Sequence, residues 1–238
     1  MEEIIEQLLP RISRSASDPR PVVVMMCGIA GAGKSTLSKA LVSALPSFTR
    51  LSLDGIVAEK HGICGVDYDN ANGEYDRYLD EAWEECKRRL AGFLRPTTAP
   101  SSPLTSTSTS TKPQEGKAKD VVFDRAFWNK ADRDEARRLI SDLGGRSVLL
   151  YLKAPDKETL WRRICGRREE ALGMSADGGG KGKGRGKLNA DCAFEITPEI
   201  LDMYWSGFEE PGEDEGAIVV DTVAGRVDWG GVGVYRPK

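Results

Sequence analysis

The sequence has very little histidine and no paired cysteines. Its 238 residues include one histidine, His61, and five cysteines that form no C-x-x-C pair. Sites built from several histidines, zinc ribbons, disulfide frameworks and a Ser-His-Asp hydrolase are therefore not indicated. An odd number of scattered cysteines fits a reducing compartment, so we expect a cytoplasmic protein.

Long apolar runs and an excess of one charge are also lacking. No apolar run approaches the roughly 20 residues of a membrane span, and the first residues are acidic where a targeting peptide would be basic. Thirty-four Lys and Arg against 37 Asp and Glu give a formal net charge of −3. This balance argues against non-specific polyanion binding as the main activity, and we expect no membrane partner.

What the sequence does contain is an alternation of apolar strands with amphipathic helices. Residues 22–27 are apolar throughout, as in a strand covered on both faces of a parallel sheet. The pattern predicts further strands over 49–53, 121–124, 147–152 and 217–221, and helices over 2–12, 34–45, 68–94, 131–143, 156–170 and 198–208. Strands that alternate with helices predict a three-layer α/β fold around a five-stranded parallel sheet.

Two low-complexity stretches interrupt this alternation. We expect residues 1–20 to form an N-terminal helical extension and residues 21–238 to form a single domain. The stretch at about 97–119 is rich in Ser, Thr and Pro, and the stretch at about 175–188 is rich in Gly and Lys. Such compositions bury too little apolar surface to repay the entropy of ordering, so we expect both to be insertions without a core of their own.

The strongest motif follows the first strand directly. Residues 28–36 read G-I-A-G-A-G-K-S-T, which matches the P-loop pattern G-x-x-x-x-G-K-[ST]. In such a loop, backbone N–H groups and the positive end of the next helix face the phosphates, a Lys reaches the β- and γ-phosphates, and a Ser ligates Mg²⁺. We therefore expect ATP and Mg²⁺ as cofactors, Ser35 as a metal ligand, and the following nucleotide-binding residues: Gly28, Ala30, Gly31, Ala32, Gly33, Lys34, Ser35 and Thr36.

Two carboxylates end apolar strands and are expected at the carboxyl edge of the sheet, where ligands bind. Asp54 is the candidate general base, which would accept the proton of a substrate hydroxyl; alternatively it caps the turn that begins at Gly55. Asp124 is the second candidate ligand of Mg²⁺. Arg125 beside it either holds substrate or phosphate, or only balances the charge of Asp124.

Two arginines share a face of the helix expected over 156–170. Arg163 and Arg167 are four residues apart, so both could close over the phosphates as part of a lid and offset the charge of phosphoryl transfer. The alternative is a solvated basic helix end that complements the helix dipole. Residues 129–132 spell the guanine-reading N-K-x-D, but we interpret Asp132 and Glu135 as a capping box for the next helix.

These segments together resemble the AAA-type ATP-binding P-loop kinases, a group similar to zeta toxins, chloramphenicol phosphotransferase, gluconate kinase and the kinase half of polynucleotide kinase. The resemblance covers about residues 22–221 and rests on the P-loop, Leu53-Asp54, and segments 121–128, 160–167 and 208–211. It implies the P-loop NTPase fold with strand order 2-3-1-4-5 and a lid. It also implies catalytic roles for Lys34, Asp54, Arg167 and Arg163, and it places the Gly/Lys-rich insertion in the lid.

The expected function is an ATP-dependent kinase that phosphorylates a hydroxyl of a small molecule, with Asp54 and Arg125 facing the substrate. A polynucleotide or RNA 5′-hydroxyl kinase is the nearest alternative. It is favoured by Lys112, Lys117, Lys119 and the Gly/Lys-rich stretch, and disfavoured by the net charge. A third possibility is a switch or adaptor that binds ATP and acts on a partner surface rather than on a small substrate.

Overall fold

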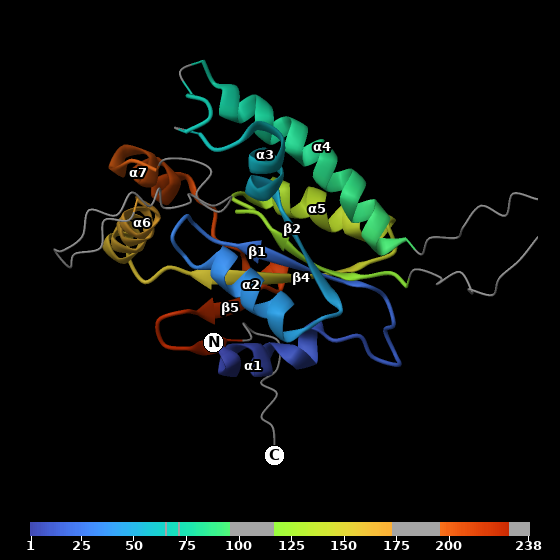
Figure 1. The fold of residues 1–238 in the computed structure, drawn as a ribbon. Coiled ribbons are helices and arrows are strands. Elements are labelled where there is room, and N and C mark those ends of the chain that lie inside the picture. The colour runs from blue at the N-terminus through green and yellow to red at the C-terminus, as the bar shows by residue number, and fades with distance from the viewer. Residues whose placement is uncertain (65, 71, 96–116, 173–195, 229–238) are drawn as a thin grey trace, which may run out of the picture.

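The computed structural model describes residues 1–64, 66–70, 72–95, 117–172 and 196–228, which are arranged around one twisted sheet (Figure 1). Its parallel strands lie in the order β2 (Phe48–Ser52), β3 (Asp120–Asp124), β1 (Val22–Cys27), β4 (Arg146–Lys153) and β5 (Ile218–Asp221). The expected α/β fold and the order 2-3-1-4-5 are therefore confirmed. A sixth strand, β6 (Arg226–Asp228), pairs antiparallel with β5 and was not predicted, because three residues are too few to show a period.

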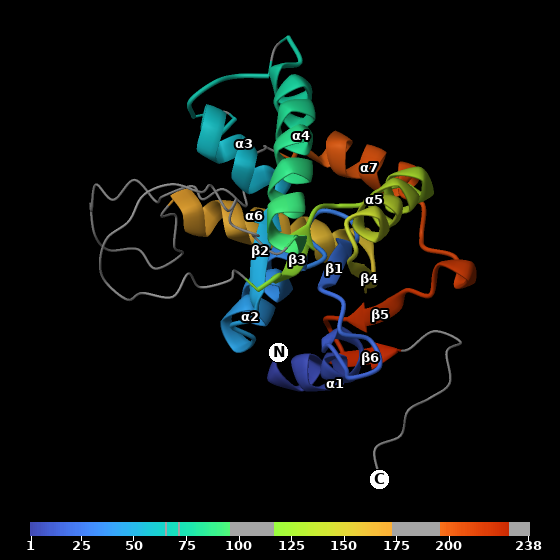
Figure 2. The ribbon, with the colours of Figure 1, turned by 90° about the vertical axis from the view of Figure 1, so that its right-hand side faces the viewer.

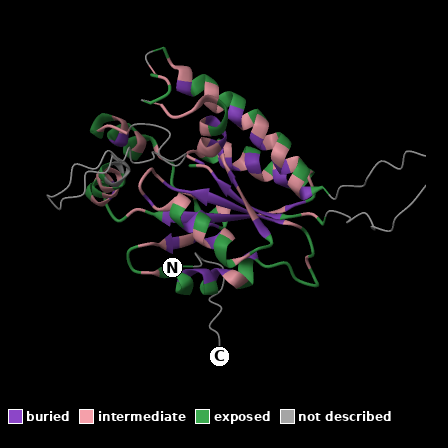
Figure 3. Cartoon of the chain, viewed as in Figure 1, coloured by how far each residue is buried: buried purple, intermediate pink, exposed green. Residues whose placement is uncertain are grey.

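Helices cover both faces of the sheet, as the apolar strand β1 requires. Its residues are all buried and alternate between two cores, with Val23 and Met25 in one and Val24 and Met26 in the other. The first core is covered by α3 (Leu53–His61), α4 (Glu74–Leu94) and α5 (Lys130–Asp142), and the second by α1 (Glu2–Ile12), α2 (Lys34–Ala44) and α6 (Lys157–Leu172). Helix α7 (Pro198–Gly207) contacts α6. Figure 3 shows the buried residues concentrated in the sheet between these layers.

The N-terminal helix packs onto the edge of the second core. Leu8 and Ile12 are fully buried, with Ile4 and Ile5 nearly so. The backbone N–H of Val227 donates to Oε1 of Gln7 at 3.2 Å, which joins α1 to β6, and Figure 2 shows the two elements side by side. The expected division of the chain at residue 20 stays a prediction.

Three local expectations differ from the structure. Helix α3 was not predicted, and α4 begins at Glu74 rather than at residue 68. Its start is fixed by Gly73, whose φ is +74°, and by Asn70, whose side chain accepts from the N–H of Tyr75 at 2.8 Å. The predicted capping box at Asp132 is wrong, because α5 begins one turn earlier: Oδ1 of Asn129 accepts from the N–H of Asp132 at 2.7 Å.

The two expected insertions lie mostly outside the described residues, which omit 96–116 and 173–195. The described ends of the first one meet: the N–H of Lys119 donates to the carbonyl of Phe93 at 2.8 Å. Within the described part of the chain, none of the helices is long and apolar enough to cross a membrane.

Candidate functional site

The loop between β1 and α2 has the backbone shape of an anion-binding loop. Gly28, Gly31 and Gly33 adopt φ angles of +143°, +83° and +103°. A Cβ on Gly28 would lie 2.8 Å from the carbonyl oxygen of Leu152, so only glycine fits this close approach. Gly33 is the N-cap of α2, and no described side chain caps that helix. Its first-turn N–H groups therefore suit the phosphates of a nucleotide.

The side chain of Lys34, the first residue of α2, folds back onto this loop. Its Nζ donates to the carbonyl oxygens of Gly28 at 2.8 Å and of Ile29 at 3.0 Å. Burial lowers the pKa of Lys34, and the negative charges of Asp124 and Asp54 oppose that shift. Two predicted carboxylates thus lie close enough to act on this amine, and a bound polyphosphate would favour its protonated form further.

Asp124 is the carboxylate at the carboxyl end of β3. It is 5% exposed, and its Oδ2 accepts from Nε of Arg50 at 2.9 Å and also from Nη2 of Arg50. Ser35 lies in the first turn of α2. Mg²⁺ is usually held by one or two protein oxygens together with substrate phosphates, so the carboxylate and hydroxyl oxygens of Asp124 and Ser35 fit this ion.

Asp54 lies at the same edge of the sheet, in the first turn of α3. Its neighbour Ser52, which pairs with Asp124 in the β2–β3 register, is the N-cap: Oγ accepts from the N–H of Gly55 at 3.1 Å. The alternative of Asp54 as a helix cap is therefore wrong. Instead, Oδ1 of Asp54 accepts from the hydroxyl of Tyr75 at 3.1 Å. Burial and the charge of Asp54 raise the pKa of Tyr75, so its hydroxyl keeps the proton that it donates.

Arg125 contacts aromatic rings rather than Asp124. Its guanidinium carbon lies 4.4 Å from the centroid of the Trp83 ring and 5.6 Å from that of Phe127. Nη2 is 3.6 Å from Oδ2 of Asp132. The charge of Asp124 is balanced by Arg50, and Arg125 does not form an ion pair with Asp124 in the described part of the structure. Substrate binding by Arg125 stays a prediction.

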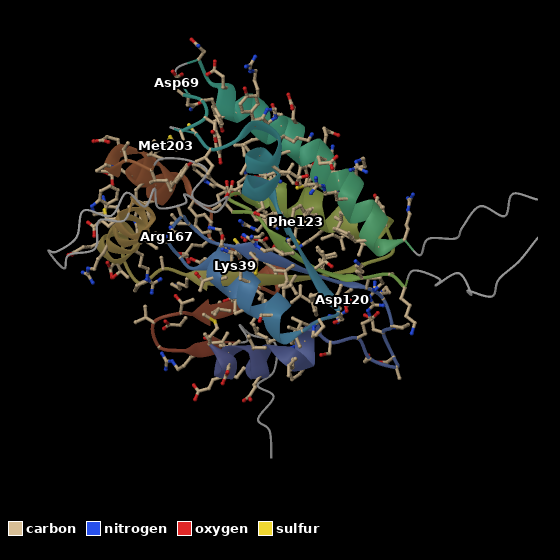
Figure 4. The ribbon with its side chains drawn as sticks, in the orientation of Figure 1. Lys39, Asp69, Asp120, Phe123, Arg167 and Met203 are labelled. Atoms are coloured by element: carbon tan, nitrogen blue, oxygen red, sulfur yellow. The ribbon has the colours of Figure 1, made fainter. Side chains whose placement is uncertain are left out.

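The two arginines of α6 have different surroundings. Arg163 is half-buried, and its Nη1 donates weakly to the carbonyl of Gly31 at 3.4 Å and to Oγ1 of Thr222 at 3.3 Å. Arg167 is exposed one turn later (Figure 4), and its charge contributes to lowering the pKa of Lys34. The helix therefore brings one arginine onto the P-loop and a second one near its lysine.

Two contacts of the site were missed by sequence reasoning. Tyr75 counted only as an apolar position of a helix, and Arg50 only as one residue of a strand. Arg50 meets Asp124 across 74 positions of sequence and Tyr75 meets Asp54 across 21. No local pattern in the sequence indicates such pairs.

Comparison with known proteins gives a family and a fold. The model of the AAA domain family matches residues 23–176. Among solved structures, a candidate kinase from Chloroflexus aurantiacus has a TM-score of 0.54 at 17% identity, over 85% of this chain and 88% of that one. Kti12 of Chaetomium thermophilum, solved with ADP-AlF3, has a TM-score of 0.49 at 13% identity, over 84% and 89%.

A gluconokinase from Sinorhizobium meliloti has a TM-score of 0.44 at 16% identity, over 85% of this chain and 82% of that one. No curated protein matches the sequence significantly. At these identities, the likeness to the Chloroflexus protein shows a common fold.

Proposed function

Because the chain belongs to the AAA domain family, we propose that it is an ATP-dependent phosphotransferase that moves the γ-phosphate of ATP to a hydroxyl of a small molecule. The observation that carries this proposal is the position of Asp54. It lies at the edge of the sheet that also holds the P-loop, it acts electrostatically on Lys34, and its Oδ1 is held by Tyr75 at 3.1 Å. A carboxylate held in this way can accept the proton of an acceptor hydroxyl.

The residues have distinct tasks in the proposed reaction. The acceptor oxygen forms a bond to the γ-phosphorus of ATP while the bond from that phosphorus to the bridging β-phosphate oxygen breaks, so that ADP leaves. Mg²⁺, when bound, would offset the charge of the phosphates. Asp54 accepts the proton of the acceptor hydroxyl through its carboxylate. The backbone N–H groups at 28–36 bind the phosphates, Lys34 offsets negative charge with its amine, and Ser35 and Asp124 hold the metal. Arg163 and Arg167 lie on the helix that would cover the phosphates.

The charge of the chain near Asp54 favours a small acceptor over a nucleic acid. Between residues 66 and 77 the sequence has four carboxylates, Asp67, Asp69, Glu74 and Asp76, and one cation, Arg77. Burial raises the pKa of Tyr204 on α7, and the charges of Asp54 and Asp76 raise it further, so Tyr204 lies close to both carboxylates. The net negative charge of this segment opposes the binding of a phosphate backbone beside Tyr75.

The direct test is a screen of hydroxyl compounds with γ-labelled ATP, in which sugars, sugar acids, nucleosides and amino alcohols are compared with 5′-hydroxyl oligonucleotides. We expect transfer to a small compound. Exclusive transfer to the oligonucleotides would establish the polynucleotide kinase alternative, and ATP binding with no transfer to any hydroxyl would favour a switch.

Substitution of Asp54 then tests the mechanism. Asp54→Asn should lower kcat for the acceptor by roughly 10²–10⁴-fold, with little change in ATP affinity, because the amide cannot accept the proton. Asp76→Asn removes another carboxylate that acts on Tyr204 and is the matched control, with near-normal kcat. An equal loss of ATP binding in Asp54→Asn would assign this residue to the nucleotide instead.

A further inference from the structure

Two ion pairs of the same kind hold the two ends of β3. At the carboxyl end, Asp124 accepts from Arg50, and at the amino end Oδ1 of Asp120 accepts from Nε of Arg14 at 2.8 Å. Both aspartates are 5% exposed. Figure 4 shows Asp120 and Arg167 well apart, whereas Asp124 lies close enough to Lys34 of the P-loop to influence the pKa of that amine.

The hydrogen bonds of Arg50 leave one carboxylate oxygen of Asp124 unused. Both Nε and Nη2 of Arg50 donate to Oδ2. Oδ1 receives no hydrogen bond from any residue that the structure describes. This oxygen is also not fully buried, so a ligand can reach it. A carboxylate fixed through one oxygen and accessible at the other is oriented to bind a further cation.

We propose that Arg50 is a positioning residue for the metal site: it fixes Asp124 through Oδ2 so that Oδ1 is presented to the Mg²⁺ that arrives with the nucleotide. This inference rests on the proposed nucleotide site. A partner that orients a metal-binding carboxylate contributes to metal affinity without touching the metal. Arg50 is suited to this task because two of its N–H groups converge on one oxygen, which a lysine cannot reproduce.

If Arg50 instead competed with Mg²⁺ for Asp124, the measured effect would have the opposite sign. Arg50 also carries a positive charge, and a guanidinium that competed with Mg²⁺ for Asp124 would weaken metal binding. Its removal would then strengthen the binding of Mg²⁺. The sign of the change in Mg²⁺ affinity therefore separates orientation from competition.

The test is calorimetric titration of ADP at a series of Mg²⁺ concentrations, in wild-type protein and in Arg50→Met. We expect the Mg²⁺ concentration that gives half of the metal-dependent gain in ADP affinity to rise by about 10- to 100-fold in Arg50→Met. ADP affinity in EDTA should stay close to that of the wild type. Arg50→Lys should restore little of the metal affinity, because one ammonium does not reproduce the fork.

Arg14→Met is the matched control, since it breaks the equivalent pair at the other end of β3 and should leave the Mg²⁺ dependence unchanged. Thermal melts of each variant verify folding, and Arg50→Gln, which keeps one donor, replaces Arg50→Met if the latter does not fold. If the folded Arg50 variant needs the same Mg²⁺ concentration as the wild type, or a lower one, the inference about Arg50 is overturned and the proposed nucleotide site is not. Failure of ADP to bind the wild type under any condition would overturn the proposed nucleotide site and this inference with it.

Discussion

A buried ion pair lies behind the site, between the side chains of Arg133 and Glu215. The side chains of Arg133 and Glu215 are each 1% exposed, and Nε of Arg133 lies 2.7 Å from Oε2 of Glu215. Arg133 Nη1 also donates to the carbonyl of Phe127 at 3.2 Å, in the turn whose Ala126 carbonyl accepts from the N–H of Gly28. The ion pair therefore anchors the turn on which the P-loop begins.

This pair predicts acid sensitivity. Burial raises the pKa of Glu215, but hydrogen bonds from Arg133, the Gly212 N–H and Arg137 lower it by more than burial raises it. The net result is a pKa of about 2, below the ordinary value of 4.5. Because the folded pKa is the lower one, the pair stabilises fully above pH 4.5, and this stabilisation is lost as the pH falls towards 2. Glu215→Gln should therefore reduce the free energy of unfolding at neutral pH by about 3 kcal/mol.

Urea unfolding from neutral pH down to about pH 3 measures this effect, and the difference between wild type and Glu215→Gln should shrink as the pH falls. Glu85→Gln is the control. Glu85 also pairs with two arginines, Arg88 and Arg89, but its side chain is 13% exposed against 1% for Glu215, so water screens its ion pairs more strongly and we expect a smaller loss of stability. Equal losses in the two variants would show that the burial of Glu215 is unimportant.

At the scale of elements, the sequence predicts correctly the helices and strands whose formation depends on neighbouring residues. The P-loop, the five parallel strands and the amphipathic helices follow from glycine spacing and apolar periodicity. Helix α3 was missed because it is short and its start depends on Ser52, a cap hidden in the end of a strand. The partners of Asp54 and Asp124 were missed because Tyr75 and Arg50 are brought to them only by the packing of α4 and the sheet.

Helix α6 carries two arginines for which the structure predicts different tasks. Arg167 is exposed and near Lys34, so Arg167→Ala should lower kcat by roughly 10²-fold or more with little effect on ATP affinity, because its charge acts mainly in the transition state. Arg163 contacts the Gly31 carbonyl, so Arg163→Ala should weaken ATP binding as well. Steady-state kinetics and ADP titration of both variants provide the measurement.

Two further variants sharpen this comparison. Arg167→Lys should rescue little, because a point charge does not reproduce the planar fork. Arg162→Ala is the control, since the side chain of Arg162 is 73% exposed and, among the described residues, its ion pair is with Glu158 on the same helix. Identical kinetic losses in Arg167→Ala and Arg162→Ala would favour the solvated basic helix end over a lid.

At the scale of the whole molecule, the described ends of the first insertion and the candidate site lie at opposite edges of the sheet. The insertion joins the end of α4 to the start of β3, which is the amino end of a parallel strand. The P-loop, Asp54 and Asp124 follow the carboxyl ends of β1, β2 and β3. The fold can therefore tolerate length at one edge without moving the residues at the other.

Deletion of residues 100–116 should accordingly leave the melting temperature and ADP affinity nearly unchanged. Leu104 is the one large apolar residue in that stretch, the Lys119–Phe93 hydrogen bond already holds its ends together, and a shorter loop costs no more entropy to close. Leu8→Ala, in the fully buried face of α1, is the contrasting control and should cost about 2–5 kcal/mol of stability. Thermal melts and ADP titrations of both variants decide the matter: if the deletion destabilises the protein as much as Leu8→Ala does, residues 100–116 contribute to a packed core.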